Sequence, residues 1–265
     1  MASRRRTCIP TKMNIYPPLK VNRVRNSATV LAFLLMLGLS VDASAQQKVS
    51  RHFPAGKNVR LELKNISGTI TVETWAKEEI KITATMEAPK ALFNPRQTEA
   101  GLVIDVVSDN RGRNDVGDIN FKVQVPARSS VDLETRRGQI TVSNIQGDLV
   151  RAHISTEGNI ELSGVNAARV FASNTIGDIY FDGEFASGGT YEFKSGRGVI
   201  TLRLPANCGF RLVATAPAQK ISMGQFWHDG MKLQGDGRRI IGDVGDGRAS
   251  VTVTNYQGNI KFLRR

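Results

Sequence analysis

The stretch Gly138-Gln139-Ile140-Thr141-Val142 recurs at 158–162, 177–181 and 198–202, each time with glycine first, isoleucine third and an apolar residue fifth. The four glycines are 20, 19 and 21 residues apart, and the same pattern also begins at Gly68 and Gly258. A nearly constant period of this size is typical of folds in which each unit packs on the next. The sequence therefore predicts a stack of repeated units.

Each period contains two short segments of alternating apolar and polar residues, separated by Gly, Asn, Asp and Ser. The alternation predicts strands with one buried face, and the separating residues predict turns. One two-strand coil cannot bury its apolar face alone, whereas stacked coils can. The predicted fold is therefore all-β: a β-solenoid, a single-stranded parallel β-helix-like stack with two short strands per coil of about 20 residues. An antiparallel sandwich is the alternative, although it gives no reason for the period.

Aligning the repeats places apolar residues in four columns that should face the interior. The columns are Val131, Ala152, Val170 and Tyr191; Leu133, Ile154, Ala172 and Phe193; Ile140, Ile160, Ile179 and Ile200; and Val142, Leu162, Phe181 and Leu202. A glycine lies two residues before each isoleucine of the third column. We expect it at a corner of the coil, where a positive φ or a close backbone approach excludes a side chain.

Residues 1–45 have the features of a secretory signal peptide. Basic residues precede an apolar run at 28–41, and Ala43-Ser44-Ala45 is a small-residue cleavage site. The alternative is a buried helix of a cytosolic protein, and Met13 is an alternative start to Met1. We expect residues 46–128 to form an N-terminal cap with less regular β coils. Residues 129–265 should form the regular solenoid, with a Gly-rich loop at 224–248 and closing strands after it.

The 265-residue chain has a formal net charge of +12, half of which lies in the leader. Without residues 1–45, 29 basic and 23 acidic side chains remain, a net charge of +6. Charge this diffuse does not indicate nucleic-acid binding. Cleavage also removes Cys8, so Cys208 has no partner for an internal disulfide. The mature chain has no second apolar run of membrane-spanning length, so we expect an exported protein of the periplasm, cell surface or extracellular space.

Several motifs resemble those of a known family. The repeated glycine words, together with the segments 123–126, 202–205 and 255–262, are similar to exported bacterial β-strand-repeat proteins described as putative adhesins, a domain of unknown function. The similarity covers roughly residues 59–265. It implies a β-helix-like fold and a cell-envelope or surface setting. It implies no activity, cofactor or site residue.

Side chains that could perform catalysis or hold a metal are scattered. They are His52, His153 and His228, Cys208, and the aspartates Asp236, Asp243 and Asp246. The histidines lack metal-ligand spacing, and the aspartates match no calcium loop. A catalytic cysteine needs a nearby base, usually a histidine. No histidine lies near Cys208 in sequence, although the fold could bring one close. We therefore expect no enzyme activity, no cofactor and no metal.

Basic residues at outward positions are the best candidates for a binding surface. They are Arg136, Arg137, Arg151, Lys194 and Arg197. Stacking could gather them into a stripe that faces an anionic glycan, a lipid head group or a protein partner. The alternative is an ordinary solvated face interrupted by Glu157. No pattern in the sequence indicates the oligomeric state.

The sequence favours a non-enzymatic exported β-solenoid protein that acts as an adhesin or as a cell-envelope binding or scaffold module. The first alternative is an envelope-stress sensor domain read by a membrane partner. The second is a β-helix carbohydrate-active enzyme. That enzyme would need two outward carboxylates about 5–9 Å apart.

Overall fold

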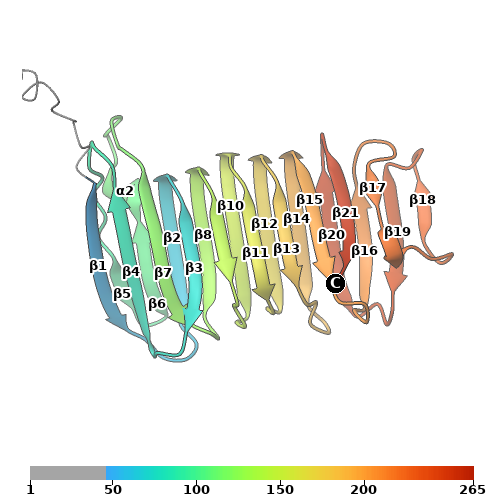
Figure 1. Cartoon of the computed structure of the whole chain (residues 1–265), viewed down its shortest axis with the longest axis horizontal. Helices are drawn as coiled ribbons and strands as arrows, with labels where there is room; N and C mark the ends of the chain where they lie inside the picture. Colours follow the sequence, from blue (N-terminus) through green and yellow to red (C-terminus); the bar gives the residue numbers. More distant parts are fainter. Residues whose placement is uncertain (1–45) are drawn as a thin grey trace, which may run out of the picture. The chain divides into compact units, whose positions relative to one another are not determined.

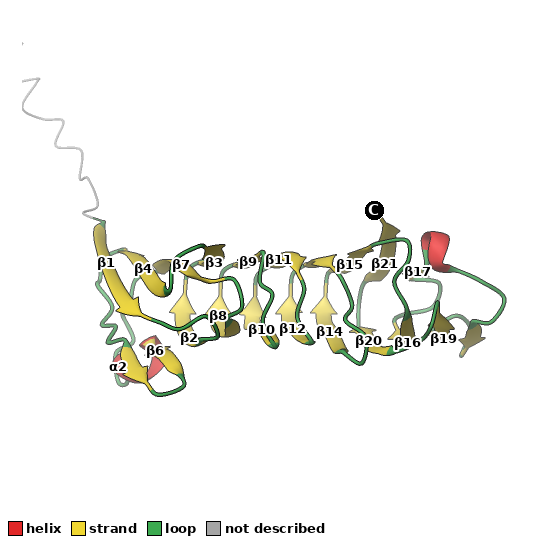
Figure 2. Cartoon of the chain, turned by 90° about the horizontal axis from the view of Figure 1, so that it is seen from below, coloured by secondary structure: helices red, strands yellow, loops and turns green. Residues whose placement is uncertain are grey.

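The computed structural model describes residues 46–265, so the predicted leader at 1–45 lies outside the described part. Residues 46–265 are nearly all β, in a ten-stranded sheet (sheet A) and an eleven-stranded sheet (sheet B) (Figure 1). The two sheets form two layers joined by turns along their margins (Figure 2). Their inner faces supply the apolar core. Within this range, every helix is too short or too polar to cross a membrane.

Sheet A contains, in spatial order, β1 (Gln47–Pro54), β4 (Glu79–Met86), β7 (Ile119–Pro126), β3 (Ile70–Trp75), β9 (Ile140–Ser143), β11 (Ile160–Val165), β13 (Ile179–Gly183), β15 (Val199–Leu204), β21 (Asn259–Arg264) and β17 (Ile221–Ser222). Sheet B contains β18 (Lys232–Gln234), β19 (Arg239–Val244), β16 (Phe210–Thr215), β20 (Ala249–Asn255), β14 (Thr190–Arg197), β12 (Arg169–Ile176), β10 (Leu149–Glu157), β8 (Ser130–Arg137), β2 (Arg60–Ser67), β6 (Gly101–Asp105) and β5 (Arg96–Thr98). A single helical turn, α2 (Val106–Asp109), follows β6, and a 3-10 turn, η1 (Gly224–Phe226), follows β17.

Both sheets are mixed. The inner strands pair in parallel, from β3 to β21 in sheet A and from β2 to β20 in sheet B. Antiparallel pairs occur toward the ends, between β1, β4 and β7, between β5 and β6, and between β16, β19 and β18. The parallel centre contradicts the antiparallel sandwich, and the antiparallel ends differ from a purely parallel stack.

The repeated glycine words form one in-register ladder in sheet A. Ile160 pairs with Ile140 on one side and with Ile179 on the other. The full column is Ile70, Ile140, Ile160, Ile179, Ile200 and Ile260, and all six side chains are buried. The neighbouring column is Val72, Val142, Leu162, Phe181, Leu202 and Phe262, which is also buried. Both columns predicted for this sheet are confirmed.

The columns predicted for sheet B are correct on three strands and wrong on β10. Val150, rather than Ala152, lies opposite Val131 and Val170. The cause is a register shift near the end of β10, where Ile154 to Glu157 spans three residues against two from Asn174 to Ile176 in β12. This shift adds one residue between the row and Gly158. The error amounts to two residues, so the inward face of β10 was still predicted correctly.

The last two strands do not close the stack, contrary to the prediction. β20 lies between β14 and β16, and β21 lies between β15 and β17. The segment predicted as a loop at 224–248 contains β18 and β19, which extend sheet B beyond β16 (Figure 1). The chain therefore forms the outer strands β16 and β17 first and then returns to insert β20 and β21 beside β14 and β15. The isoleucine column continues through this change of order, because Ile260 pairs with Ile200.

The opposite end contains a similar detour. β2 and β3 pair directly with β8 and β9, although β4, β5, β6 and β7 separate them in sequence. Ile70 pairs with Ile140 in the same register as the inner strands. Regular pairing therefore extends to residues that precede position 129.

The glycine that opens each word lies where adjacent backbones approach most closely. A Cβ on Gly158 would overlap the carbonyl oxygen of Gly138, and the φ angle of Gly158 is +149°. A Cβ on Gly177 would overlap the Gly158 carbonyl in the same way. Both the space and the backbone conformation exclude a side chain, as predicted.

Polar side chains connect successive words at this corner. The Oδ1 atom of Asn159 accepts the N–H of Asp178 at 2.8 Å, and Oδ1 of Asp178 accepts the N–H of Val199 at 2.8 Å. On the buried side, Nδ2 of Asn174 donates to the carbonyl of Gly158 at 2.9 Å. These bonds satisfy backbone groups that the turn removes from the sheet ladders, and they tie each repeat to the next.

Candidate functional site

The outer face of sheet B presents one side chain from every second residue of each strand. The register aligns Asp132, Arg151, Phe171 and Glu192 in one row across β8, β10, β12 and β14. Neighbouring strands are about 4.8 Å apart, so the side chains of such a row contact one another. This row lines a shallow groove, which we call the sheet B groove.

The sheet B groove has a volume of about 430 Å³. It is lined by Arg60 of β2, Asp132 of β8, Leu149 and Arg151 of β10, Arg169, Phe171, Ala172 and Ser173 of β12, and Glu192 and Lys194 of β14. The groove combines four cations, two carboxylates, a hydroxyl group and an aromatic ring. Such a lining suits a ligand that has negative charge, hydroxyl groups and flat apolar faces.

Asp132 organises the cations at one end of the groove. Its Oδ2 atom lies 3.7 Å from Nη2 of Arg60 and 3.6 Å from Nη1 of Arg151. Arg60 also pairs with Glu62, whose Oε1 atom lies 2.8 Å from Nε of Arg60. Two carboxylates therefore balance these two guanidinium groups. Arg169 and Lys194 form no ion pair with any side chain in the described range 46–265. Both cations are thus available to an anionic ligand.

A second hollow of about 690 Å³ lies where the loop after α2 overhangs the same face. Its walls include Glu134 and Arg136 of β8, and Arg111 and Arg113 of the loop. Arg113 donates to the carbonyl of Lys90 at 2.9 Å. This guanidinium is therefore used to hold the loop, and the hollow offers fewer free cations than its composition suggests.

The five basic residues predicted to bind an anion fall in three places. Arg151 and Lys194 line the sheet B groove, and Arg136 lines the second hollow. Arg137 and Arg197 lie in one row at the ends of β8 and β14. Glu157 and Ile176 lie between them in that row, on β10 and β12. The structure therefore divides the predicted stripe, and Glu157 interrupts it as the alternative interpretation expected.

Sequence reasoning missed Arg60, Arg169 and Phe171. Strand alternation alone could have found the last two, because Val170 between them belongs to a predicted inward column. Alternation also directs Arg60 outward, between the buried Val59 and Leu61, but it does not indicate which strands lie beside Arg60. Arg60 reaches the groove only because β2 pairs with β8 across 70 residues of sequence, as in the pair Arg60 and Ser130.

Two of the candidate aspartates in the Gly-rich segment, and the histidine of β10, are paired with other side chains. His153 points outward, as predicted, and its Nδ1 lies 2.8 Å from Oγ of Ser173. Asp243 pairs with Arg211 at 2.9 Å, and Asp246 pairs with Arg248 at 3.3 Å. Within residues 46–265, no three His, Cys, Asp or Glu side chains are grouped as metal ligands would be.

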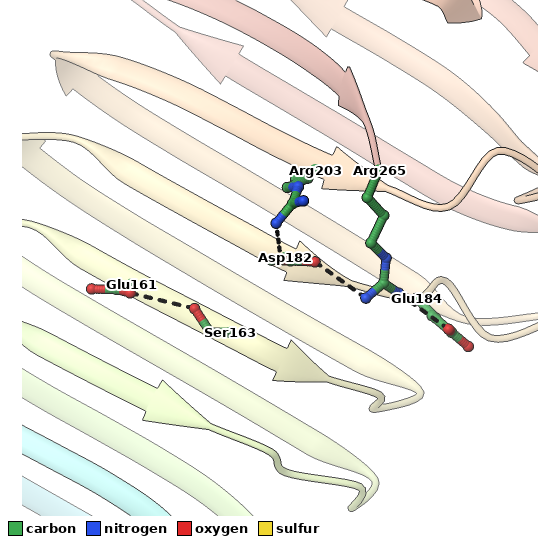
Figure 3. Close-up of polar contacts among 6 residues, drawn as sticks. All are labelled: Glu161, Ser163, Asp182, Glu184, Arg203 and Arg265. Atoms are coloured by element: carbon green, nitrogen blue, oxygen red, sulfur yellow. Dashed lines mark hydrogen bonds and ion pairs between the residues drawn. The ribbon is translucent and has the colours of Figure 1, made fainter.

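Carboxylates on the outer face of sheet A form an ion-pair cluster (Figure 3). Asp182 of β13 lies 3.1 Å from Nη1 of Arg203 and 3.5 Å from Nη1 of Arg265. Glu184 lies 3.2 Å from Nη2 of the same Arg265. A hydrogen bond with Tyr180 and the charge of Asp182 raise the pKa of Arg203 above its usual value. Both carboxylates are therefore neutralised by guanidinium groups. The cluster can hold Arg265, just after β21, near β13.

Cys208 lies partly buried in the turn before β16. Burial raises the pKa of its thiol from 9.0 to about 11. Because the thiolate is the reactive form, we expect iodoacetamide at pH 8 to alkylate the native protein about a hundredfold more slowly than the unfolded chain. The rate should rise as the pH approaches the raised pKa. Mass spectrometry of timed samples with and without urea measures both rates, and equal rates would contradict the assignment.

No family model matches the chain, and no curated protein matches its sequence. Among solved structures, a putative cell adhesion protein from Clostridium sporogenes superposes with a TM-score of 0.53 at 13% identity, over 83% of this chain and 100% of that one. A putative adhesin from Bacteroides fragilis gives a TM-score of 0.40 at 11% identity, over 83% and 99% of the two chains. The first likeness shows a shared fold and nothing about activity. The second is too weak to carry an argument.

Proposed function

We propose that this chain is an exported, non-enzymatic β-solenoid that acts in adhesion at the cell envelope or cell surface. The in-register pairing of like side chains from β2 and β3 to β20 and β21 supports the solenoid. The basic and apolar leader supports export. The Clostridium sporogenes structure of the same fold is described as a putative cell adhesion protein, which agrees with adhesion.

The sheet B groove is the observation that carries the proposed binding function. Arg60, Arg151, Arg169 and Lys194 come from four different strands and line one hollow. Strands hold these side chains at a set spacing, so binding requires little reorganisation of the protein. The proposed ligand is anionic, and its affinity should fall as the salt concentration rises.

The double substitution Arg151→Ala/Arg169→Ala tests this function. We expect it to weaken binding to an acidic polysaccharide such as polygalacturonate by tenfold or more. The reason is that a hydrogen bond to a charged group contributes about 1.5–3 kcal/mol, and about 1.4 kcal/mol corresponds to a factor of ten in affinity. Calorimetric titration of the mature protein at about 0.15 M salt, where exposed charges more than about 8 Å apart are largely screened, measures the change.

The matched control is the triple variant Arg136→Ala/Arg137→Ala/Arg197→Ala. It removes more positive charge than the double variant, but it leaves the groove lining intact. Its affinity should stay within about threefold of the wild type, because distant exposed charges are largely screened. Loss of binding in the control, or full binding in the double variant, would place the site elsewhere.

Export is tested separately by fractionation of cells that express the full chain. Processing at Ala45 and recovery outside the cytosol are expected. Recovery of the full-length chain in the cytosol, with the leader attached, would contradict export and would leave the groove measurements unaffected.

A further inference from the structure

The sheet B groove continues beyond its last cation. Nζ of Lys194 lies 5.6 Å from the centre of the Tyr256 ring, just after β20. The Tyr256 side chain is exposed at 60% and borders a further hollow of about 330 Å³, together with Pro217, Ala218 and Arg238. Lys194 lines the groove and Tyr256 lines the further hollow, so their contact places the two hollows next to each other. We call the two hollows together the sheet B track.

The sheet B track crosses the strands instead of following one of them. It passes from Arg60 on β2 over β8, β10, β12 and β14 to Tyr256 after β20. Five steps between neighbouring strands cover about 24 Å at the usual strand spacing. A single sugar or phosphate group can occupy only a small part of this length. An extended chain molecule can occupy all of it.

The order of side chains along the track indicates the chemistry of that chain. Arg151 and Phe171 are register neighbours, and Glu192 follows Phe171 in the same row. Lys194, the next outward residue of β14, contacts Tyr256, so the track presents cations, aromatic rings and a carboxylate close together. Cations bind carboxylates, and aromatic rings offer flat apolar surfaces for the carbon face of a sugar ring. The carboxylate of Glu192 can accept hydrogen bonds from hydroxyl groups.

The acidic residues of the groove favour a sugar chain over a more highly charged polymer. Asp132 and Glu192 lie in the same row as Arg151 and would repel closely spaced phosphates. A polysaccharide that has one carboxylate per sugar and several hydroxyl groups needs both cations and hydrogen-bond acceptors. The lining of the sheet B track supplies both.

We propose that the sheet B track binds a linear polysaccharide containing uronic acid units, extended across the strands from Arg60 to Tyr256. This inference rests on the proposed function of the groove and adds the class of ligand and its direction. Carboxylates of the ligand bind Arg151, Arg169 and Lys194. Its sugar rings pack on Phe171 and Tyr256.

The test is a series of oligogalacturonates of increasing length, titrated into the mature protein. Affinity should rise with length until the oligomer spans the track, and should then level off. Tyr256→Ala should weaken the longest oligomers about tenfold and leave the shortest almost unchanged. Tyr256→Phe retains the ring and should bind like the wild type. Because Tyr256 is exposed, these variants should fold normally, and circular dichroism checks this.

The outcomes separate this inference from the proposed function. Affinity that is independent of oligomer length but lost in Arg151→Ala/Arg169→Ala would overturn the track and retain an anion-binding groove. Equal affinity for neutral cello-oligosaccharides would overturn the role of the carboxylates. Binding of phosphatidylglycerol vesicles without binding of any oligogalacturonate would replace the sugar chain by a lipid surface. Failure of the wild type to bind any of these probes would overturn both proposals.

Discussion

The substitution Gly158→Ala is expected to lower the free energy of unfolding by about 3 kcal/mol or more. Two effects add at this position. The new Cβ would overlap the carbonyl oxygen of Gly138 on the neighbouring strand connection, and alanine would have to adopt a φ of +149°. The clashing atom belongs to the backbone, so no side-chain movement can relieve the contact. Urea unfolding of the mature protein, followed by circular dichroism, measures the loss.

Two other glycines separate the two effects. A Cβ on Gly258 would overlap the Gly198 carbonyl without a φ in the left-handed range, so Gly258→Ala tests the close approach alone. A Cβ on Gly56 would meet nothing within 4 Å, so Gly56→Ala should change stability by less than about 0.5 kcal/mol. Similar unfolding midpoints for Gly158→Ala and Gly56→Ala would mean that the strands do not stack at this spacing.

The substitution Phe181→Ala is expected to cost about 3–5 kcal/mol, because it empties a large space in the core. Phe181 is fully buried between the sheets, and its ring centre lies 5.6 Å from that of Phe185 and 5.2 Å from that of Phe193. The backbone cannot collapse into the cavity, because parallel neighbours hold β13 on both sides. The same urea titration measures this loss.

The control for Phe181 is Leu233→Ala in β18. Leu233 is 58% exposed, so its removal should change stability by less than about 0.5 kcal/mol. Phe181→Leu retains much of the apolar volume and should fall between the two. Equal stability of Phe181→Ala and Leu233→Ala would show that the second apolar column of sheet A does not form the core.

The sequence predicted the outward direction of several site residues, but it did not predict which of them come together in one groove. Alternation correctly directed Arg151 and Lys194 outward, since Arg151 lies between two buried apolar residues and Lys194 follows the buried Phe193. Their grouping with Arg60 depends on a pairing between β2 and β8 that skips the five strands β3 to β7. The connection to Tyr256 depends on the position of β20 beside β14. Neither pairing leaves a local pattern.

The sequence by itself determined the repeat, the glycine corners and the face of each strand that is buried. These features are local, because a period of two along a strand and a glycine at each turn act within one repeat. Only the tertiary structure decided the order of strands at both ends, the shifted register of β10 and the course of the sheet B track. Apolar columns on successive strands pack equally well in several orders, so the order is selected by long-range pairing energies that no short stretch of sequence expresses.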